Sequence, residues 1–70
     1  MKMNRVNFRK IRELRLEQKI STAKMATLIN VSKEEYKKIE AGKKEPCLND
    51  LIYIARNLGI RTAELLNEKI

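Results

Sequence analysis

The apolar positions in the middle of the chain recur at helical rather than strand spacing. Met25, Ala26 and Ile29 fall at i, i+1 and i+4, which places them on one face of a helix. Tyr36 and Ile39 give the following segment an inward face of its own. The pattern therefore predicts two short helices whose apolar faces meet in a common core.

Polar residues mark where these two helices begin and end. Ser21 or Thr22 can cap the first helix, and Asn30, which readily takes a left-handed conformation, stands where that helix must end. Ser32 opens the second helix and forms, with Glu35, the Ser-x-x-Glu pattern of a capping box. Two short helices joined by so tight a turn are typical of a helix-turn-helix motif.

The same periodicity predicts three further helices, which complete an all-α bundle of five helices around the central helix-turn-helix. Gly42 closes the third helix, and Gly59 is the left-handed stop expected after the fourth. The additional helices are expected over residues 8–18, with Asn7 as the N-cap, and over residues 48–57 and 62–67.

The sequence also predicts the surroundings of two individual side chains, Tyr36 and Cys47. The ring of Tyr36 is expected in the core, with its hydroxyl reaching the surface as buried tyrosines often arrange it. Cys47 stands at the start of the fourth helix, where a thiol caps poorly, so Asn49 or Asp50 is expected to help.

The charge of the chain is strongly positive and unevenly distributed. The formal net charge is +7, and the isoelectric point is about 9.9. Residues 1–32 hold eight lysines and arginines against two acidic residues. Such a balance favours nucleic acid or an anionic membrane surface as the partner. Residues 1–6 show no periodicity and are expected to be either a partly disordered start or an arm whose Lys2 and Arg5 contact nucleic acid.

Several chemistries are excluded by what the sequence lacks. The chain has no histidine, one cysteine and no glycine-rich phosphate loop. Neither a metal site, nor a cofactor, nor an enzyme is therefore expected. No apolar run approaches the length of a membrane span, and no signal peptide is recognisable. We expect one cytoplasmic domain of 70 residues, without a disulfide, membrane contact or small-molecule ligand.

Several short runs, in this order and spacing, resemble the phage Cro and repressor family, also called the xenobiotic-response-element type of helix-turn-helix. The resemblance covers residues 11–66 and implies a lambda-repressor-like DNA-binding domain. The runs are I-R-E-L-R (11–15), M-A-T-L-I-N-V-S (25–32), I-E-A-G-K (39–43), Pro46 with Leu48, L-I-Y-I-A-R-N-L-G-I (51–60) and A-E-L-L (63–66).

The resemblance also implies roles for individual side chains. Arg15 is expected to pair with Glu40 and so tie the first helix to the third. Helix 33–41 would lie in the major groove of double-stranded DNA, where lysine can donate to guanine and glutamate can accept from cytosine. The implied base-reading residues are Lys33, Glu34 and Lys38, the implied phosphate contacts are Thr22, Lys37, Lys43 and Lys44, and a homodimer surface is expected at Tyr53, Ile60, Arg61 and Ile70.

These observations predict a small transcriptional regulator, a repressor that binds specific DNA sequences as a homodimer. Glu34 leaves a question open, because a carboxylate near phosphates repels them: either it reads a cytosine or it points to solvent. The acidic pair Glu34 and Glu35 also keeps open an alternative, a protein-interaction module of the same fold, such as an antirepressor or antitoxin-like adaptor. RNA binding is a second alternative, because the N-terminal third is basic.

Overall fold

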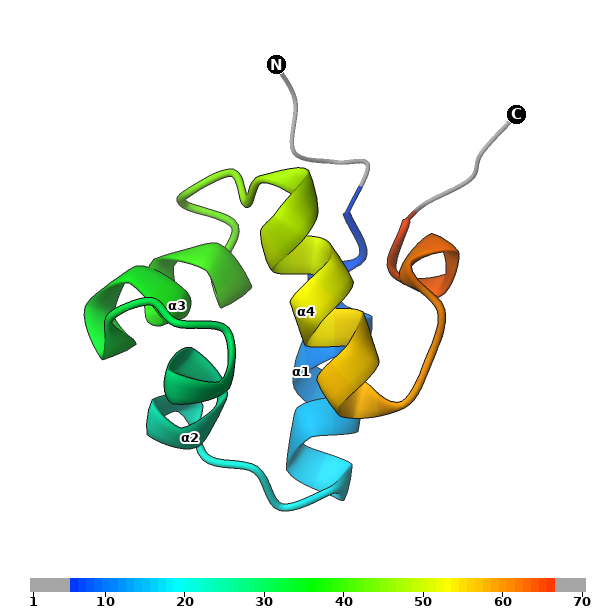
Figure 1. Cartoon of the computed structure of the whole chain (residues 1–70), viewed down its shortest axis with the longest axis horizontal. Helices are drawn as coiled ribbons and strands as arrows, with labels where there is room; N and C mark the ends of the chain where they lie inside the picture. Colours follow the sequence, from blue (N-terminus) through cyan, green and yellow to red (C-terminus); the bar gives the residue numbers. More distant parts are fainter. Residues whose placement is uncertain (1–5, 67–70) are drawn as a thin grey trace.

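The computed structural model describes residues 6–66, and every regular element in this range is helical (Figure 1). The all-helical prediction with a central helix-turn-helix is confirmed. Four α-helices are followed by a single turn of 3-10 helix, η2. The bounds are Phe8–Glu17 for α1, Thr22–Leu28 for α2, Lys33–Glu40 for α3, Leu48–Leu58 for α4 and Thr62–Leu65 for η2.

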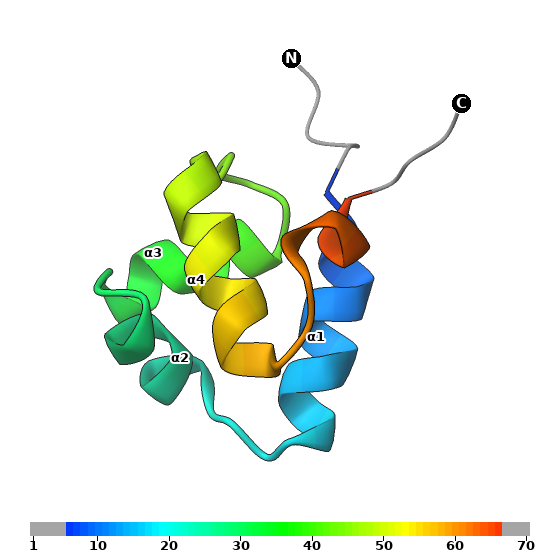
Figure 2. The same cartoon turned by 45° about the vertical axis from the view of Figure 1, so that its right-hand side comes forward.

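Helix α4 is the central element of the packing. It crosses in front of α1 in Figure 1, with α2 and α3 to one side and η2 to the other, and it contacts α1, α2 and η2. The turned view in Figure 2 keeps α2 and α3 together, on the side away from η2. One core lies between these elements. Its buried apolar residues are Val6, Ile11, Met25, Ala26, Ile29, Tyr36, Ile39, Leu51, Ile54, Ala55, Leu58 and Leu65.

The helix ends follow the polar residues that the sequence offers. The side chains of Asn7, Ser21 and Ser32 accept backbone N–H groups at the starts of α1, α2 and α3. Cys47 precedes α4, and its N–H donates to the Asp50 carboxylate at 3.3 Å, so the expected help comes from Asp50. Gly59 ends α4 in a left-handed conformation with φ +79°.

The two ends of the described range meet, which corrects two expectations. Val6 is buried and forms an antiparallel bridge with Leu66, so it belongs to the folded domain rather than to an arm. The fifth helical element begins at Thr62 as expected, but it is a single 3-10 turn that ends at Leu65, and its Leu65 carbonyl accepts the Asn7 N–H at 2.7 Å. This bond fastens the turn to the start of α1. The expectations for residues 1–5 and 67–70 lie outside the described residues.

None of the helices described is both long and apolar enough to cross a membrane. The longest, α4, has 11 residues, whereas a span needs about 20 apolar ones.

Candidate nucleic-acid interface

The turn between α2 and α3 is built on one left-handed residue. Asn30 has φ +63°, a conformation that asparagine adopts more readily than most residues. Its position lets the chain reverse so that the Val31 N–H reaches the Ala26 carbonyl at 3.0 Å, and the Val31 side chain packs against the core. Ser32 then caps α3 by accepting the Glu35 N–H at 3.0 Å. This turn fixes the direction in which α3 leaves α2.

Helix α3 has one buried and one exposed face. Tyr36 and Ile39 are fully buried, and at a spacing of i to i+3 they lie on the same face of the helix. The opposite face carries four charged side chains that are all exposed to solvent. They are Lys33, Glu34, Lys37 and Lys38.

A buried arginine ties α3 to the rest of the domain. The Arg15 guanidinium donates through Nε to Glu40 Oε2 at 2.8 Å and through Nη2 to Glu40 Oε1 at 3.0 Å. Its Nη1 donates to the Ile20 carbonyl at 2.7 Å, just before α2. Only 7% of Arg15 is exposed. One side chain of α1 therefore holds both the approach to α2 and the end of α3, and the two residues that the resemblance pairs are in contact.

Tyr36 is the third member of this cluster, and here the sequence-based expectation is wrong. Its hydroxyl was expected at the surface, but the residue is fully buried and the hydroxyl donates to Glu40 Oε2 at 2.6 Å. The spacing is i to i+4, so the two side chains lie one above the other on α3. The hydroxyl stays inside because the Glu40 carboxylate is ionised, and an ionised acceptor forms a stronger hydrogen bond than a neutral one.

The proton affinities of the cluster follow from these contacts. The hydrogen bond to Glu40 holds the pKa of Arg15 above its ordinary value. Burial raises the pKa of the Glu40 carboxyl, but the hydrogen bonds from Arg15 and Tyr36 outweigh it, and the net pKa is lowered. The pKa of the Tyr36 hydroxyl is raised mainly by burial and, to a smaller extent, by the hydrogen bond to Glu40. At neutral pH the cluster is therefore an ion pair with a protonated tyrosine.

The acidic pair at the start of α3 divides into two different environments. The capping box is only half made: Ser32 accepts the Glu35 N–H, but within residues 6–66 the Ser32 N–H makes no hydrogen bond to the Glu35 carboxylate. That carboxylate lies 3.6 Å from Lys44 Nζ instead. Glu34 is exposed and, in the described part of the chain, has no ion pair. Glu35 is thus drawn toward the loop beyond α3.

That loop turns back at Gly42, which has φ +77°. A side chain at this position would be strained by the backbone, and the ring of Phe8 lies 3.6 Å from where its Cβ would stand. The N–H groups of Lys43 and Lys44 both donate to the Lys38 carbonyl, at 2.8 and 3.2 Å. Two exposed lysines are thereby held beside the end of α3.

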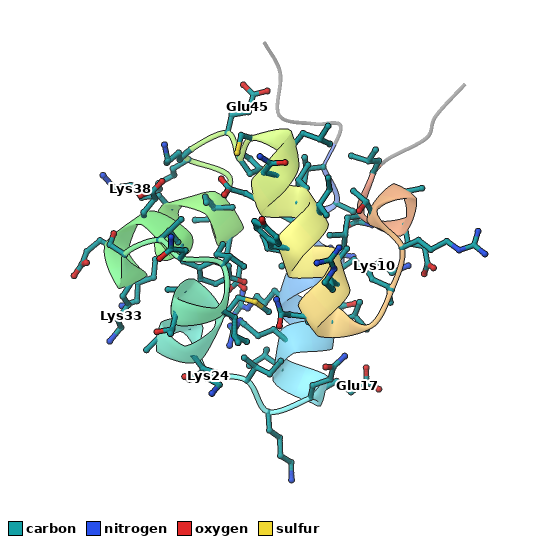
Figure 3. The ribbon with its side chains drawn as sticks, in the orientation of Figure 1. Lys10, Glu17, Lys24, Lys33, Lys38 and Glu45 are labelled. Carbon is teal, nitrogen blue, oxygen red and sulfur yellow. The ribbon has the colours of Figure 1, made fainter. Side chains whose placement is uncertain are left out.

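Lysines from α2 and α3 lie along one side of the molecule. Figure 3 shows Lys24, Lys33 and Lys38 projecting on the α2–α3 side, with Lys10 on the opposite side of α4. Lys24 is exposed in the first turns of α2 and was not among the expected contacts, although its position two residues after Thr22 could have suggested it. Thr22 itself is the half-buried first residue of α2.

The residues expected at a dimer surface have mixed environments. Tyr53 is 44% exposed and Arg61 is exposed, whereas Ile60 is half-buried because it packs against the core. Ile70 lies outside the described residues. Leu48, at the start of α4, is 65% exposed, and this apolar surface was not anticipated.

Among residues 6–66, no group of three or more acidic, cysteine or histidine side chains is arranged to hold a metal ion. Cys47 is a free, exposed thiol. The chemistry that this surface offers is charge and hydrogen bonding.

Comparison with known proteins shows that other proteins share this helix-turn-helix fold. The model of the helix-turn-helix family matches residues 11–65. The controller protein C.AhdI of a restriction-modification system from Aeromonas hydrophila has a TM-score of 0.77 and 28% identity, over 86% of this chain and 92% of that one. The clp gene regulator ClgR from Corynebacterium glutamicum has a TM-score of 0.81 at 20% identity, over 93% and 69% of the two chains, and shows the shared fold.

A third structure shares the fold within a larger protein. Hydroxypropylphosphonic acid epoxidase from S. wedmorenis has a TM-score of 0.78 and 26% identity, over 96% of this chain. The match covers only 36% of the epoxidase chain, so the similarity concerns one part of that enzyme. No curated protein sequence matches this chain.

Proposed function

The chain belongs to the helix-turn-helix family of DNA-binding transcription regulators, and from this premise we propose that it is a repressor that binds a specific double-stranded DNA sequence. The family implies a regulator rather than an enzyme. In this proposal the chain acts as one domain, with residues 11–66 as its core, and α3 enters the major groove.

The observation that carries the proposal is the two-sidedness of α3. Its inner face is immobilised by fully buried Tyr36 and Ile39 and by the Arg15–Glu40 pair. Its outer face presents only charged side chains, three of them lysines, to solvent. A rigid helix with a charged outer face matches what the major groove requires, since a groove-reading helix must hold its side chains in register with base edges.

The exposed side chains divide into two proposed roles. Side chains in the first turn of α3, and one turn after it, would contact base edges. Lysines would donate to guanine, and Glu34 would accept from cytosine. Those at the flanks would neutralise phosphates and supply the salt-dependent part of the affinity. The proposed base readers are Lys33, Glu34 and Lys38, and the proposed phosphate contacts are Thr22, Lys37, Lys43 and Lys44, to which we add Lys24.

We also propose that two copies bind DNA together. Exposed Tyr53 and Arg61, with half-buried Ile60, would contribute to the contact between them. Two copies of α3 would then read half-sites about 34–36 Å apart, one turn of the DNA helix. A repressor of this kind occupies its operator and excludes the transcription machinery.

The test is selection of bound duplexes from a randomised pool at physiological salt. An enriched motif with two-fold symmetry is expected. An enriched asymmetric motif would support sequence-specific binding but contradict the homodimer. Enrichment of nothing above background would contradict the proposed function.

The structure bears on the alternative of a protein-interaction module. Its best support was the acidic pair, but the Glu35 carboxylate lies 3.6 Å from Lys44 Nζ, which leaves Glu34 as the carboxylate of the two without an ion pair in the described range. Charge reversal on α3, for example Lys38→Glu, should abolish DNA binding under our proposal and leave an adaptor functional. Competition between duplex DNA and duplex RNA distinguishes the RNA alternative, because the deep, narrow major groove of RNA does not admit this helix.

A further inference from the structure

Lys44, a proposed phosphate contact, already has an anionic partner in the free protein. Its Nζ lies 3.6 Å from Glu35 Oε2. The side chains are 45% and 38% exposed, so the pair is accessible to solvent and to an approaching phosphate. The contact joins the loop after α3 to the first turn of the same helix.

The backbone explains why Lys44 reaches so far back. Because Gly42 is left-handed and the N–H groups of Lys43 and Lys44 share the Lys38 carbonyl, the loop folds over the end of α3. Lys44 therefore starts beside α3, and its side chain extends along the helix toward Glu35.

We propose that Glu35 is an internal competitor for Lys44, so that a DNA phosphate must displace the Glu35 carboxylate before Lys44 can bind it. The inference rests on the proposed DNA-binding function. While the Lys44–Glu35 ion pair is formed, Lys44 contributes less positive charge to the surface that approaches DNA. Glu35 thus lowers affinity for DNA of any sequence, because a phosphate contact carries no sequence information.

Glu34 provides a matched control on a random-sequence duplex, where its proposed reading of particular bases is averaged over all sequences. It is the adjacent residue, it lies in the same first turn of α3, and it is exposed. In residues 6–66 it has no ion pair. Substituting either glutamate by glutamine removes one negative charge from the same end of the helix, but only Glu35→Gln releases Lys44.

The experiment is a double-mutant cycle on a random-sequence duplex, followed by fluorescence anisotropy at about 50 mM salt, where exposed charges are weakly screened. The variants are Glu35→Gln, Lys44→Gln, their combination and Glu34→Gln. We expect Glu35→Gln to tighten binding about two- to fivefold beyond Glu34→Gln, the range that an exposed ion pair can supply. With Lys44→Gln already present, the gain from Glu35→Gln should shrink to that of Glu34→Gln.

Two further measurements sharpen the cycle. Lys44→Arg keeps the charge and should preserve the coupling, and the coupling should shrink at about 200 mM salt because the pair is exposed. Thermal melting should be nearly the same for all variants, which separates the effect from a loss of structure.

The failures of the two proposals can be told apart. Binding of the unmodified chain with additive effects of Glu35→Gln and Lys44→Gln would overturn this inference alone. So would equal gains from the two glutamate substitutions. Normal affinity in Lys44→Gln would overturn the inference and would also remove Lys44 from the proposed phosphate contacts. No binding of the unmodified chain to any duplex would overturn the proposed function and the inference with it.

Discussion

Arg15 and Glu40 meet through two parallel hydrogen bonds of 2.8 and 3.0 Å, and this contact fixes α3 against α1. Their side chains are only 8% and 10% exposed, so neither charge has much water around it. A bidentate pair with a planar guanidinium fixes direction as well as distance. The surface proposed to read DNA is thus held from behind by an interaction that points away from it.

The first prediction concerns the stability that depends on this pair. Arg15→Ala should lower the free energy of unfolding by about 3–5 kcal/mol, because it leaves the Glu40 carboxylate buried without its partner. Urea denaturation followed by circular dichroism measures the loss. Lys10→Ala serves as the control: it removes an ion pair with Glu64 that is 3.7 Å long and whose side chains are 38% and 46% exposed.

Loss of so exposed a pair should cost below about 1 kcal/mol. Equal losses in Arg15→Ala and Lys10→Ala would contradict the structural role assigned to Arg15. The combined variant Arg15→Met, Glu40→Gln should recover part of the stability, because no unpaired charge then remains buried and the Gln amide oxygen can still accept from the Tyr36 hydroxyl.

The second prediction concerns acid. The folded state holds the pKa of Glu40 below its ordinary value of 4.5. The folded chain therefore binds this proton less readily than the unfolded chain, and Glu40 contributes its full stability above that value. The contribution is lost as the pH falls below about 4.5 toward the folded pKa. Denaturant melts between about pH 6 and 3 should show a steeper fall in unmodified protein than in Glu40→Gln. Parallel curves would contradict the contribution of the Glu40 carboxylate to the acid dependence of stability.

The third prediction concerns alkali and Tyr36. The folded state raises the pKa of its hydroxyl above the ordinary value of 10.0, through burial and the bond to Glu40. The stabilising proton is fully present below the unfolded pKa, and stability falls as the pH rises beyond about 10. Tyr36→Phe should lose about 1.5–3 kcal/mol at neutral pH, the value of a hydrogen bond to a charged group.

The alkaline part of the curve is the specific readout for Tyr36. Denaturant melts of Tyr36→Phe should show a smaller fall in stability above about pH 10 than melts of the unmodified chain. If the two curves run parallel there, the hydroxyl is not the group responsible.

How much of this could be predicted from sequence depends on how local each cause is. The caps at Asn7, Ser21 and Ser32 and the left-handed turn at Asn30 depend on a few neighbouring residues, and these predictions are confirmed. The bond between the Asn7 N–H and the carbonyl of Leu65, the last residue of η2, joins residues far apart in sequence, and local spacing does not predict such a contact.

The site shows the same division. The partners Arg15 and Glu40 are far apart in sequence, and only the family resemblance paired them. The Tyr36–Glu40 bond was missed although its i to i+4 spacing was visible, because a tyrosine hydroxyl was assumed to prefer water. The Lys44–Glu35 contact could not be predicted, because the spacing of Ser32 and Glu35 favours a capping box and the contact depends on how the loop after α3 folds back. A polar side chain can have several possible hydrogen-bond or ion-pair partners, and sequence spacing alone does not show which contact forms.

The last prediction separates base reading from phosphate binding on the exposed face of α3, where Lys33 and Lys37 are both solvent-exposed. Lys37→Ala should weaken binding alike on selected and random duplexes and reduce the salt slope by about 1, because it removes one phosphate contact. Lys33→Ala should instead cost about 1–3 kcal/mol on the selected duplex alone and relax the preference at particular base pairs. Anisotropy titrations on both duplexes at several salt concentrations provide the comparison. If the two variants lose affinity in the same proportion on both duplexes, the first turn of α3 does not read bases, and the division of roles proposed for this helix is wrong.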